Sequence, residues 1–500
     1  AVVAHHDIYR SYLWAADADI IYAYQALLIN DGLKQDYFDH PGYPYFVILS
    51  LWIRLSAFLG LVDILRFSQL PGPSDFEPVY AQLVFAGRWL SVLLAAIFAF
   101  VVYYHLRRLT NRFWLAAIMG VLVVISPGVV TQSLIMRNEL PAMLLALLAF
   151  FSLVHACRTH GVDAYRHLFW AGLFAMLSLL TKLQTIFLLL FFPLLALIFG
   201  QRGTTRASVA IPPEPGTRTL ATAFVFGAIA FVIPAAAMLI GQIARFGGGV
   251  YQSIVALYLV LAMLAYTSFY RYSHRDAGFA LLALLAGFSA GLYSNLIHLA
   301  VENTASVANF IVHMRAFSSE GLSAAKSVEE LSQAIYYRLP VHLLETLWRI
   351  YVEVDWAASP TQPVYWLVTV GAFVAALTDR RLALQASGLV AVAIAMETVT
   401  RLRYWAQHYQ IFTEAWVYIA CALLIAGMLG SRAWSGLTRQ SRKAALTALV
   451  VAAAGIAILS INFAIQDRSG GQEQDPNNVC TLGRGFLKRL PSHFDKYCSP

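Results

Sequence analysis

Charged residues are scarce in this sequence. Only 12% of its 500 residues are Asp, Glu, Lys or Arg, 59% are apolar, and the mean hydropathy is +0.64. A soluble chain of this length carries about twice that share of charge, so a water-soluble globular protein is excluded. The composition predicts an all-α, polytopic membrane protein.

Cysteine is also rare, with four residues in the chain. Four are too few for a disulfide framework in a protein of this size. Cys157 ends one apolar run and Cys421 lies inside another, which favours packing roles for both. Cys480 and Cys498 flank a polar tail, and we expect them to form a disulfide if that tail lies outside the cytoplasm.

A basic stripe interleaved with aromatic residues is missing, although the net charge is +8. The arginines and lysines lie in short clusters between apolar runs, which is typical of cytoplasmic loops of membrane proteins. The excess of basic over acidic residues therefore reflects membrane topology, and a nucleic-acid partner is excluded.

Apolar runs long enough to span a bilayer number about twelve. Every second loop between them is basic, which places these loops in the cytoplasm and the alternate loops outside. Both ends of the chain then lie outside, and we expect a thirteenth span before Ala1. The runs lie near 81–105, 113–130, 139–157, 166–181, 184–200, 219–241, 250–270, 277–298, 361–378, 382–398, 408–429 and 444–464.

The predicted organisation has five parts. In the first part, residues 1–80, we expect a helix near 20–30, a turn at Asn30-Asp31-Gly32 and an interfacial helix within Tyr43–Leu65. Charged residues interrupt this last run. The third part, residues 299–360, contains an acidic, helix-like stretch at Ser327–Leu339. Within the second part, we expect 201–218 to be a flexible linker. The parts are a first extracytoplasmic loop (1–80), a transmembrane bundle (81–298), a large extracytoplasmic loop (299–360), C-terminal transmembrane helices (361–464) and an extracytoplasmic tail (465–500).

Carboxylates are concentrated in the first loop. Asp17 and Asp19 come first, and Asp36 and Asp39 precede His40. Acids grouped between hydrophobic regions are costly unless they have a function, so we interpret this segment as a catalytic loop. Asp19 can instead cap a helix that begins directly after it. Asp36 and Asp39 are typical of solvated loop acids, and His40 of a structural histidine before a turn.

Several basic residues lie on the outer side, where positive charge is unusual. Lys182 ends a span there, and either phosphate binding or snorkelling to lipid headgroups explains it. Arg137 and Glu139 share the short second outer loop, as a salt bridge or as part of a donor site. Interfacial anchoring explains the aromatics of a late cluster but not its two arginines, so lipid-phosphate binding is favoured. This cluster contains Arg401, Arg403, Tyr404 and His408.

The order of these motifs resembles that of the GT-C glycosyltransferases. Their first extracytoplasmic loop typically reads Asp-Glu-x-x-Tyr-x-x-x-Ala, followed by Gly and by His-Pro-Pro or Lys-Pro-Pro. Here Ala18-Asp19 stands at the acidic pair, with Asp17 one residue earlier, and His40-Pro41 is followed by Gly42. The other matching pieces are Tyr22, Ala26 and Gly32, Arg88 opening a span that ends in Arg107-Arg108, Ser126-Pro127 before Arg137-Asn138-Glu139, Thr181-Lys182, and Arg401-Leu402-Arg403-Tyr404-Trp405.

The resemblance implies an integral membrane glycosyltransferase that moves a sugar from a polyprenyl-phosphate carrier to an extracytoplasmic lipid, glycan or protein, with inversion. Such a transfer needs a carboxylate base at the acceptor hydroxyl and cations at the leaving phosphate. We assign Asp19 as the base and keep Asp17 as the second candidate. The expected substrate- or donor-phosphate-binding residues are His40, Arg88, Arg137, Glu139, Lys182, Arg401, Arg403, Tyr404 and His408.

The sequence predicts no metal site, because its loop histidines are too widely spaced for zinc. No cofactor is implied beyond the lipid-linked sugar, and a divalent metal has no support. We expect a bacterial inner membrane location with the site facing the periplasm or exterior. The alternative function is a multi-span transporter or lipid flippase, which is disfavoured because the acids lie in loops and no half of the chain is duplicated.

Overall fold

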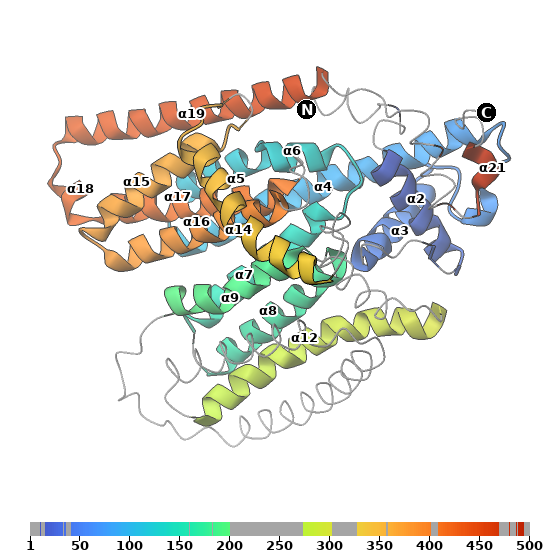
Figure 1. Ribbon diagram of the computed structural model, residues 1–500, viewed down its shortest axis with the longest axis horizontal. Coiled ribbons are helices and arrows are strands. Elements are labelled where there is room, and N and C mark those ends of the chain that lie inside the picture. Colours follow the sequence, from blue (N-terminus) through green and yellow to red (C-terminus); the bar gives the residue numbers. More distant parts are fainter. Residues whose placement is uncertain are drawn as a thin grey trace. The chain divides into compact units, whose positions relative to one another are not determined.

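The described part of the chain is helical throughout. The computed structural model describes residues 11, 16–33, 35–36, 42–159, 161–182, 184–200, 274–302, 328–356, 359–401, 409–469, 480, 487 and 489–494. Within these residues every regular element is a helix (Figure 1). The all-α prediction is confirmed.

Five of the described helices are long and apolar enough to cross a membrane. The count of about twelve spans is not confirmed, and the predicted spans at 219–241 and 250–270 lie outside the described residues. The five are α4 (Phe76–Thr110), α7 (Glu139–Ala156), α16 (Arg380–Arg401), α17 (Ile411–Gly430) and α19 (Arg439–Ser469).

The run predicted at 113–130 forms a broken helix. α5 (Phe113–Val124) and α6 (Pro127–Ser133) meet at an angle of 59° and together are long and apolar enough for a sixth span. The break has a local cause, because Pro127 has no amide hydrogen and disfavours the helical conformation in the residue before it. Ser126 is accordingly extended, with φ −66° and ψ 150°.

The other described apolar runs also form helices. These are α8 (Gly161–Thr181), α9 (Thr185–Phe199), α12 (His274–Glu302) and α15 (Gln362–Ala376). Here the predicted helices are present, although α9, α15 and the apolar part of α12 are shorter than a full span.

The chain divides into two compact units, of which the first contains residues 1–38, 42–141 and 327–500. The second contains 39–41 and 142–326, and within it α8 packs along α12 (Figure 1). Glycines allow this close approach: a Cβ at Gly172 would lie 2.1 Å from the Leu284 carbonyl oxygen, and one at Gly287 would lie 1.8 Å from that of Phe169. Small residues at such contacts are typical of membrane helices.

Two helices in the first unit form the predicted first loop. α2 (Ala16–Asn30) packs on α3 (Tyr43–Phe58). The predicted turn is present, with Gly32 in the left-handed region at φ 66°, which glycine adopts without strain. Asn30 Oδ1 accepts hydrogen bonds from Ser50 Oγ at 2.7 Å and from Arg54 Nε at 2.6 Å. These bonds fasten the end of α2 to α3.

The start of α2 differs from the expectation. The helix begins at Ala16, so Asp19 lies inside its first turn. The interpretation of Asp19 as the cap of a helix that begins after it is therefore wrong.

Two helices near the predicted loops carry exposed apolar side chains. α3 buries Tyr45, Phe46 and Leu49 but exposes Leu51 and Phe58. α14 (Val328–Tyr351) includes the predicted helical stretch and continues beyond it, with Trp348 exposed. This pattern suits a helix at a membrane surface, and the interfacial position of α3 stays a prediction.

The C-terminal tail packs against the first loop. Arg489 Nε lies 3.3 Å from Asp36 Oδ2, and His493 Nε2 lies 3.1 Å from the Pro71 carbonyl oxygen. The His493 ring also contacts Phe76, and the short helix α21 (Pro491–Phe494) carries this histidine (Figure 1). The contact agrees with the expectation that the first loop and the tail lie on the same side of the membrane, and this placement stays a prediction.

The tail also contains the predicted disulfide position. Cys480 is disulfide-bonded, and Cys498 lies outside the described residues, so their pairing stays a prediction. Cys157 and Cys421 are buried and are not in disulfides, as expected for packing residues.

Single cysteines introduced at Ser74 and Ser492 should react with a membrane-impermeant maleimide from the same side. Both positions are exposed, and their segments are in contact through His493. A cysteine at exposed Ser435, in α18 (Arg432–Gly436), should react only from the other side, because α19 separates it from the tail. Labelling of positions 74 and 492 from opposite sides would contradict this topology.

Candidate active site

A buried ion pair joins α2 to α4. The Arg88 guanidinium donates to Asp19 Oδ2 from Nη2 at 2.6 Å and from Nε at 3.1 Å. Both side chains are 0% exposed. Two charges are costly to remove from water unless their geometry and further hydrogen bonds compensate. The pair therefore marks a specific contact between the predicted catalytic loop and α4.

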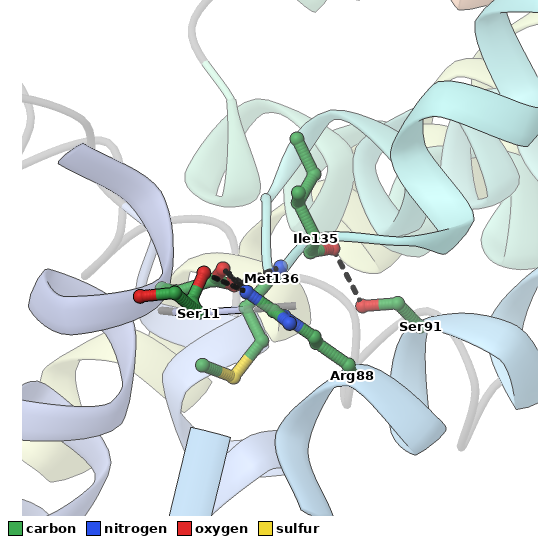
Figure 2. A network of polar contacts seen from close by, with 6 residues as sticks. Ser11, Arg88, Ser91, Ile135 and Met136 are labelled. Carbon is green, nitrogen blue, oxygen red and sulfur yellow. Dashed lines mark hydrogen bonds and ion pairs between the residues drawn. The ribbon is translucent and has the colours of Figure 1, made fainter. Parts of the chain in front are cut away.

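The second oxygen of Asp19 is bound by backbone. The Met136 amide donates to Asp19 Oδ1 at 2.8 Å. Arg88 Nη2 also donates to the Ser11 carbonyl oxygen at 3.3 Å (Figure 2). Asp19 thus accepts at least these three hydrogen bonds, which hold both of its carboxylate oxygens in place.

The segment that supplies this amide is held against α4. Figure 2 shows the Ser91 hydroxyl donating to the Ile135 carbonyl oxygen, at 2.9 Å. Met136 lies directly against Gly87 of α4, because a Cβ at this glycine would come 2.0 Å from the Met136 sulfur. Met136 therefore lies against the residue directly before Arg88, and Ile135 is bound about one turn after it.

A second buried carboxylate lies near the first. Glu139 begins α7, is 1% exposed, and pairs with Arg137 at 3.9 Å between Nη1 and Oε1, which is one of the two roles expected for these residues. Burial raises the pKa of Tyr45 above its ordinary value, and the negative charges of Asp19 and Glu139 raise it further. The phenol of Tyr45 therefore stays protonated, which leaves the carboxylates as candidate bases.

The structure brings together only some of the predicted residues. Asp19, Arg88, Arg137 and Glu139 all belong to the first unit. Lys182 follows α8 in the second unit and is 2% exposed. Arg401 ends α16 and Asp17 lies in α2. The structure does not describe the side chains of these two residues. The remaining predicted positions, His40, Arg403, Tyr404, His408 and Cys498, lie outside the described residues.

Arg88 is also placed differently from the expectation. It does not open its helix, because α4 begins at Phe76 and Arg88 lies about three turns further on. Its observed partner is a carboxylate of the first loop. The geometry thus links Arg88 to the orientation of Asp19.

Asp36 was interpreted as a solvated loop acid, and that interpretation is wrong. Its side chain is 13% exposed, is paired with Arg489 and accepts a hydrogen bond from the Tyr24 hydroxyl. Burial raises the pKa of Tyr24 above its ordinary value, and Asp36 raises it further. The partner on the tail is more than 450 residues away in sequence, so local pattern gave no signal for this contact.

Sequence reasoning missed Glu414. This residue lies in the first turn of α17, is 2% exposed and accepts hydrogen bonds from two other segments of the first unit. A signal was present, because Glu414 is an acid within the predicted span 408–429 and intramembrane acids are costly. The Met136 amide was also missed, since a backbone donor leaves no mark in a side-chain pattern.

Residues 61–241 match the family model of dolichyl-phosphate-mannose-protein mannosyltransferases. This is a GT-C family, so the predicted resemblance is confirmed. The matched range includes Arg88, Arg137, Glu139 and Lys182 and begins after Asp19. No curated protein matches the sequence significantly.

The match and the apolar helices together indicate a glycosyltransferase of the membrane. Among the described residues, no three His, Cys, Asp or Glu side chains group closely enough to hold a metal ion. The described site is therefore built from carboxylates, arginines and backbone donors.

Proposed function

We propose that this protein transfers a sugar from a polyprenyl-phosphate carrier to an acceptor outside the cytoplasm, with Asp19 as the general base. The observation that carries the proposal is the buried carboxylate of Asp19, which Arg88 and the Met136 amide hold in one orientation. The family match supports the reaction class. The family is named for mannose transfer from dolichyl phosphate mannose to protein, and we propose the same class of donor here.

The reaction needs a proton acceptor and a site for the leaving phosphate. As the acceptor oxygen bonds to the anomeric carbon, its proton passes to Asp19, and the bond from that carbon to the phosphate oxygen breaks. Polyprenyl phosphate leaves with the bonding electrons and needs cations rather than an acid. Attack from the face opposite the phosphate inverts the anomeric carbon.

Arg88 orients the base in this proposal. Its two hydrogen bonds to Asp19 Oδ2 hold the carboxylate in one orientation. An acceptor hydroxyl must come within about 2.6–3.2 Å of Asp19, and Asp19 is fully buried. Substrate binding must therefore displace residues that cover it.

We assign the donor phosphate to the remaining basic residues. Lys182 is 2% exposed, whereas a lysine that snorkels to lipid headgroups is exposed when the protein is considered alone. Its burial supports phosphate binding over snorkelling. Arg137, Arg401 and Arg403 are further residues that we propose to bind phosphate, and the proposed location is a bacterial plasma membrane with the site facing outward.

Transfer from a lipid-linked donor tests the proposal. Proteoliposomes containing the purified protein are supplied with radiolabelled polyprenyl-phosphate mannose or with a nucleotide-linked mannose, together with an extract of cell-envelope acceptors. Label should reach the acceptor fraction only from the lipid-linked donor. Transfer from the nucleotide-linked donor alone would contradict the proposal.

Lys182→Ala should weaken donor binding. A buried phosphate would lose a charge-assisted partner worth about 1.5–3 kcal/mol, which raises the Kd roughly 10- to 150-fold. Lys182→Arg keeps the charge and should bind more tightly than Lys182→Ala. Titration of each variant with polyprenyl-phosphate mannose measures the effect, and wild-type affinity in Lys182→Ala would remove this residue from the donor site.

A further inference from the structure

Glu414 forms a buried clamp between three segments of the first unit. Its Oε2 accepts hydrogen bonds from the Ser126 hydroxyl at 2.6 Å and from the Gly128 amide at 2.9 Å. Its Oε1 accepts one from the Thr361 hydroxyl at 3.2 Å. Glu414 is 2% exposed, Ser126 is 0% exposed and Thr361 is 4% exposed. One carboxylate thus joins α17 to the α5–α6 bend and to the start of α15.

The clamp acts on the bend at Pro127. Ser126 and Gly128 flank this proline, so Glu414 binds the chain on both sides of the 59° break. Gly128 is in close contact with α17, because a Cβ at this position would lie 2.3 Å from the Ile411 amide nitrogen and 2.8 Å from Glu414 Oε2. Glu414 therefore constrains the direction in which α6 leaves the bend that Pro127 causes.

α6 connects this clamp to Asp19. The helix spans only Pro127–Ser133, a length of about 10 Å, and a short helix moves as one body. It is followed by Ile135, whose carbonyl accepts from Ser91, and by Met136, whose amide donates to Asp19. A change in the direction of α6 thus moves the amide that orients the candidate base.

We propose that Glu414 is a positioning residue for the reaction: it fixes the α5–α6 bend and thereby places the Met136 amide against Asp19. The inference rests on the proposed function, because it assigns Glu414 an effect on the base and no contact with substrate. It differs from a purely structural role in one respect. Loss of the clamp should alter how Asp19 takes a proton, in addition to any effect on folding.

Kinetics of clamp variants test the proposal. Glu414→Ala should lower kcat by about 10- to 100-fold, the usual effect of a misplacement of about 1 Å, with little change in the KM for polyprenyl-phosphate mannose. The acidic limb of its pH–rate profile should move to higher pH, because a carboxylate that loses a donor is protonated more readily. Glu414→Gln keeps the volume and one acceptor oxygen and should recover much of the lost kcat.

Two further variants separate positioning from stability. Gly128→Ala displaces the bend from the other side and should reproduce the loss of kcat and the shift of the pH profile. Thr398→Val removes a partly buried hydrogen bond within α16, from Thr398 Oγ1 to Ile394 O, and should leave both unchanged. Soluble yield and thermal unfolding of each detergent-purified variant identify any that fail to fold.

The outcomes distinguish this inference from the proposed function. If Glu414→Ala and Gly128→Ala fold and retain the wild-type kcat and pH profile, Glu414 has no positioning role, and transfer by the wild type still stands. Loss of kcat with an unchanged pH profile would also overturn the inference. If the wild type transfers no sugar from the lipid-linked donor, the proposed function fails first.

Discussion

Replacing Asp19 by asparagine should lower turnover by about 10²–10⁴-fold, the usual contribution of a positioned base. Asparagine keeps the size of the side chain and an oxygen that can accept from the Met136 amide. It removes the charge that takes the proton from the acceptor. Initial rates of sugar transfer from polyprenyl-phosphate mannose measure the loss.

The buried ion pair requires a control for this variant. In Asp19→Asn the Arg88 guanidinium remains buried beside a neutral amide, so part of the loss could reflect misfolding. The double variant Asp19→Asn/Arg88→Met removes both charges. It should fold better than Asp19→Asn and remain inactive.

Asp17→Asn provides the matched comparison. Residues two positions apart on a helix point about 200° from each other, and α2 contains both aspartates. Asp17→Asn should therefore retain most of the turnover. If Asp17→Asn is inactive and Asp19→Asn is active, the base is Asp17. Normal turnover in both variants would show that this loop is not catalytic.

Replacing Arg88 alone should have the largest effect on stability. Arg88→Met leaves Asp19 buried without its cation, which costs about 3–5 kcal/mol when one partner of a buried pair is removed. The midpoint of thermal unfolding in detergent should fall, and turnover should fall with it because Asp19 loses its orientation. Differential scanning fluorimetry and the transfer assay on the same preparations measure the two effects.

Arg54→Met is the control for Arg88→Met. Arg54 is exposed and its hydrogen bond goes to the neutral Asn30 side chain, so its loss should cost about 0.5–1.5 kcal/mol. An Arg88→Met protein as stable as Arg54→Met would contradict the importance of the buried pair. Full turnover in Arg88→Met would contradict its role in orienting Asp19.

Much of the helical pattern could be predicted from the sequence. Uninterrupted apolar runs lead directly to helices such as α4 and α17, because a chain in lipid must satisfy its own backbone hydrogen bonds. The turn at Gly32 was predicted as well, since glycine adopts the left-handed conformation that ends α2. The break at Pro127 was not predicted, although the proline supplies its cause.

The candidate site was predictable only in part. Asp19 and Arg88 could each be selected, because a charge in an apolar chain is costly unless it has a role. Their pairing could not be predicted, since it joins positions 69 residues apart through the packing of α2 on α4. The Met136 amide is a backbone group, so no residue type identifies it. The contact of Arg489 with Asp36 likewise depends on the path of the whole chain.

A transporter or lipid flippase remains the alternative function to be tested. It would also use a polytopic helical chain, but its charges would line a path near the bilayer midplane. The described part of the chain shows one buried pair that joins α2 to α4, Asp19–Arg88, and the family match is to a glycosyltransferase. These observations favour chemistry on the carrier over its movement.

The fate of the carrier tests the central claim most directly. Wild-type protein and Asp19→Asn/Arg88→Met are incubated in proteoliposomes with polyprenyl-phosphate mannose and acceptor extract, and the lipids are then analysed by mass spectrometry. A glycosyltransferase should convert the carrier to free polyprenyl phosphate in the wild type and leave it intact in the double variant. Intact polyprenyl-phosphate mannose in both samples, with the lipid moved to the opposite leaflet by the wild type, would contradict the proposal and identify a flippase.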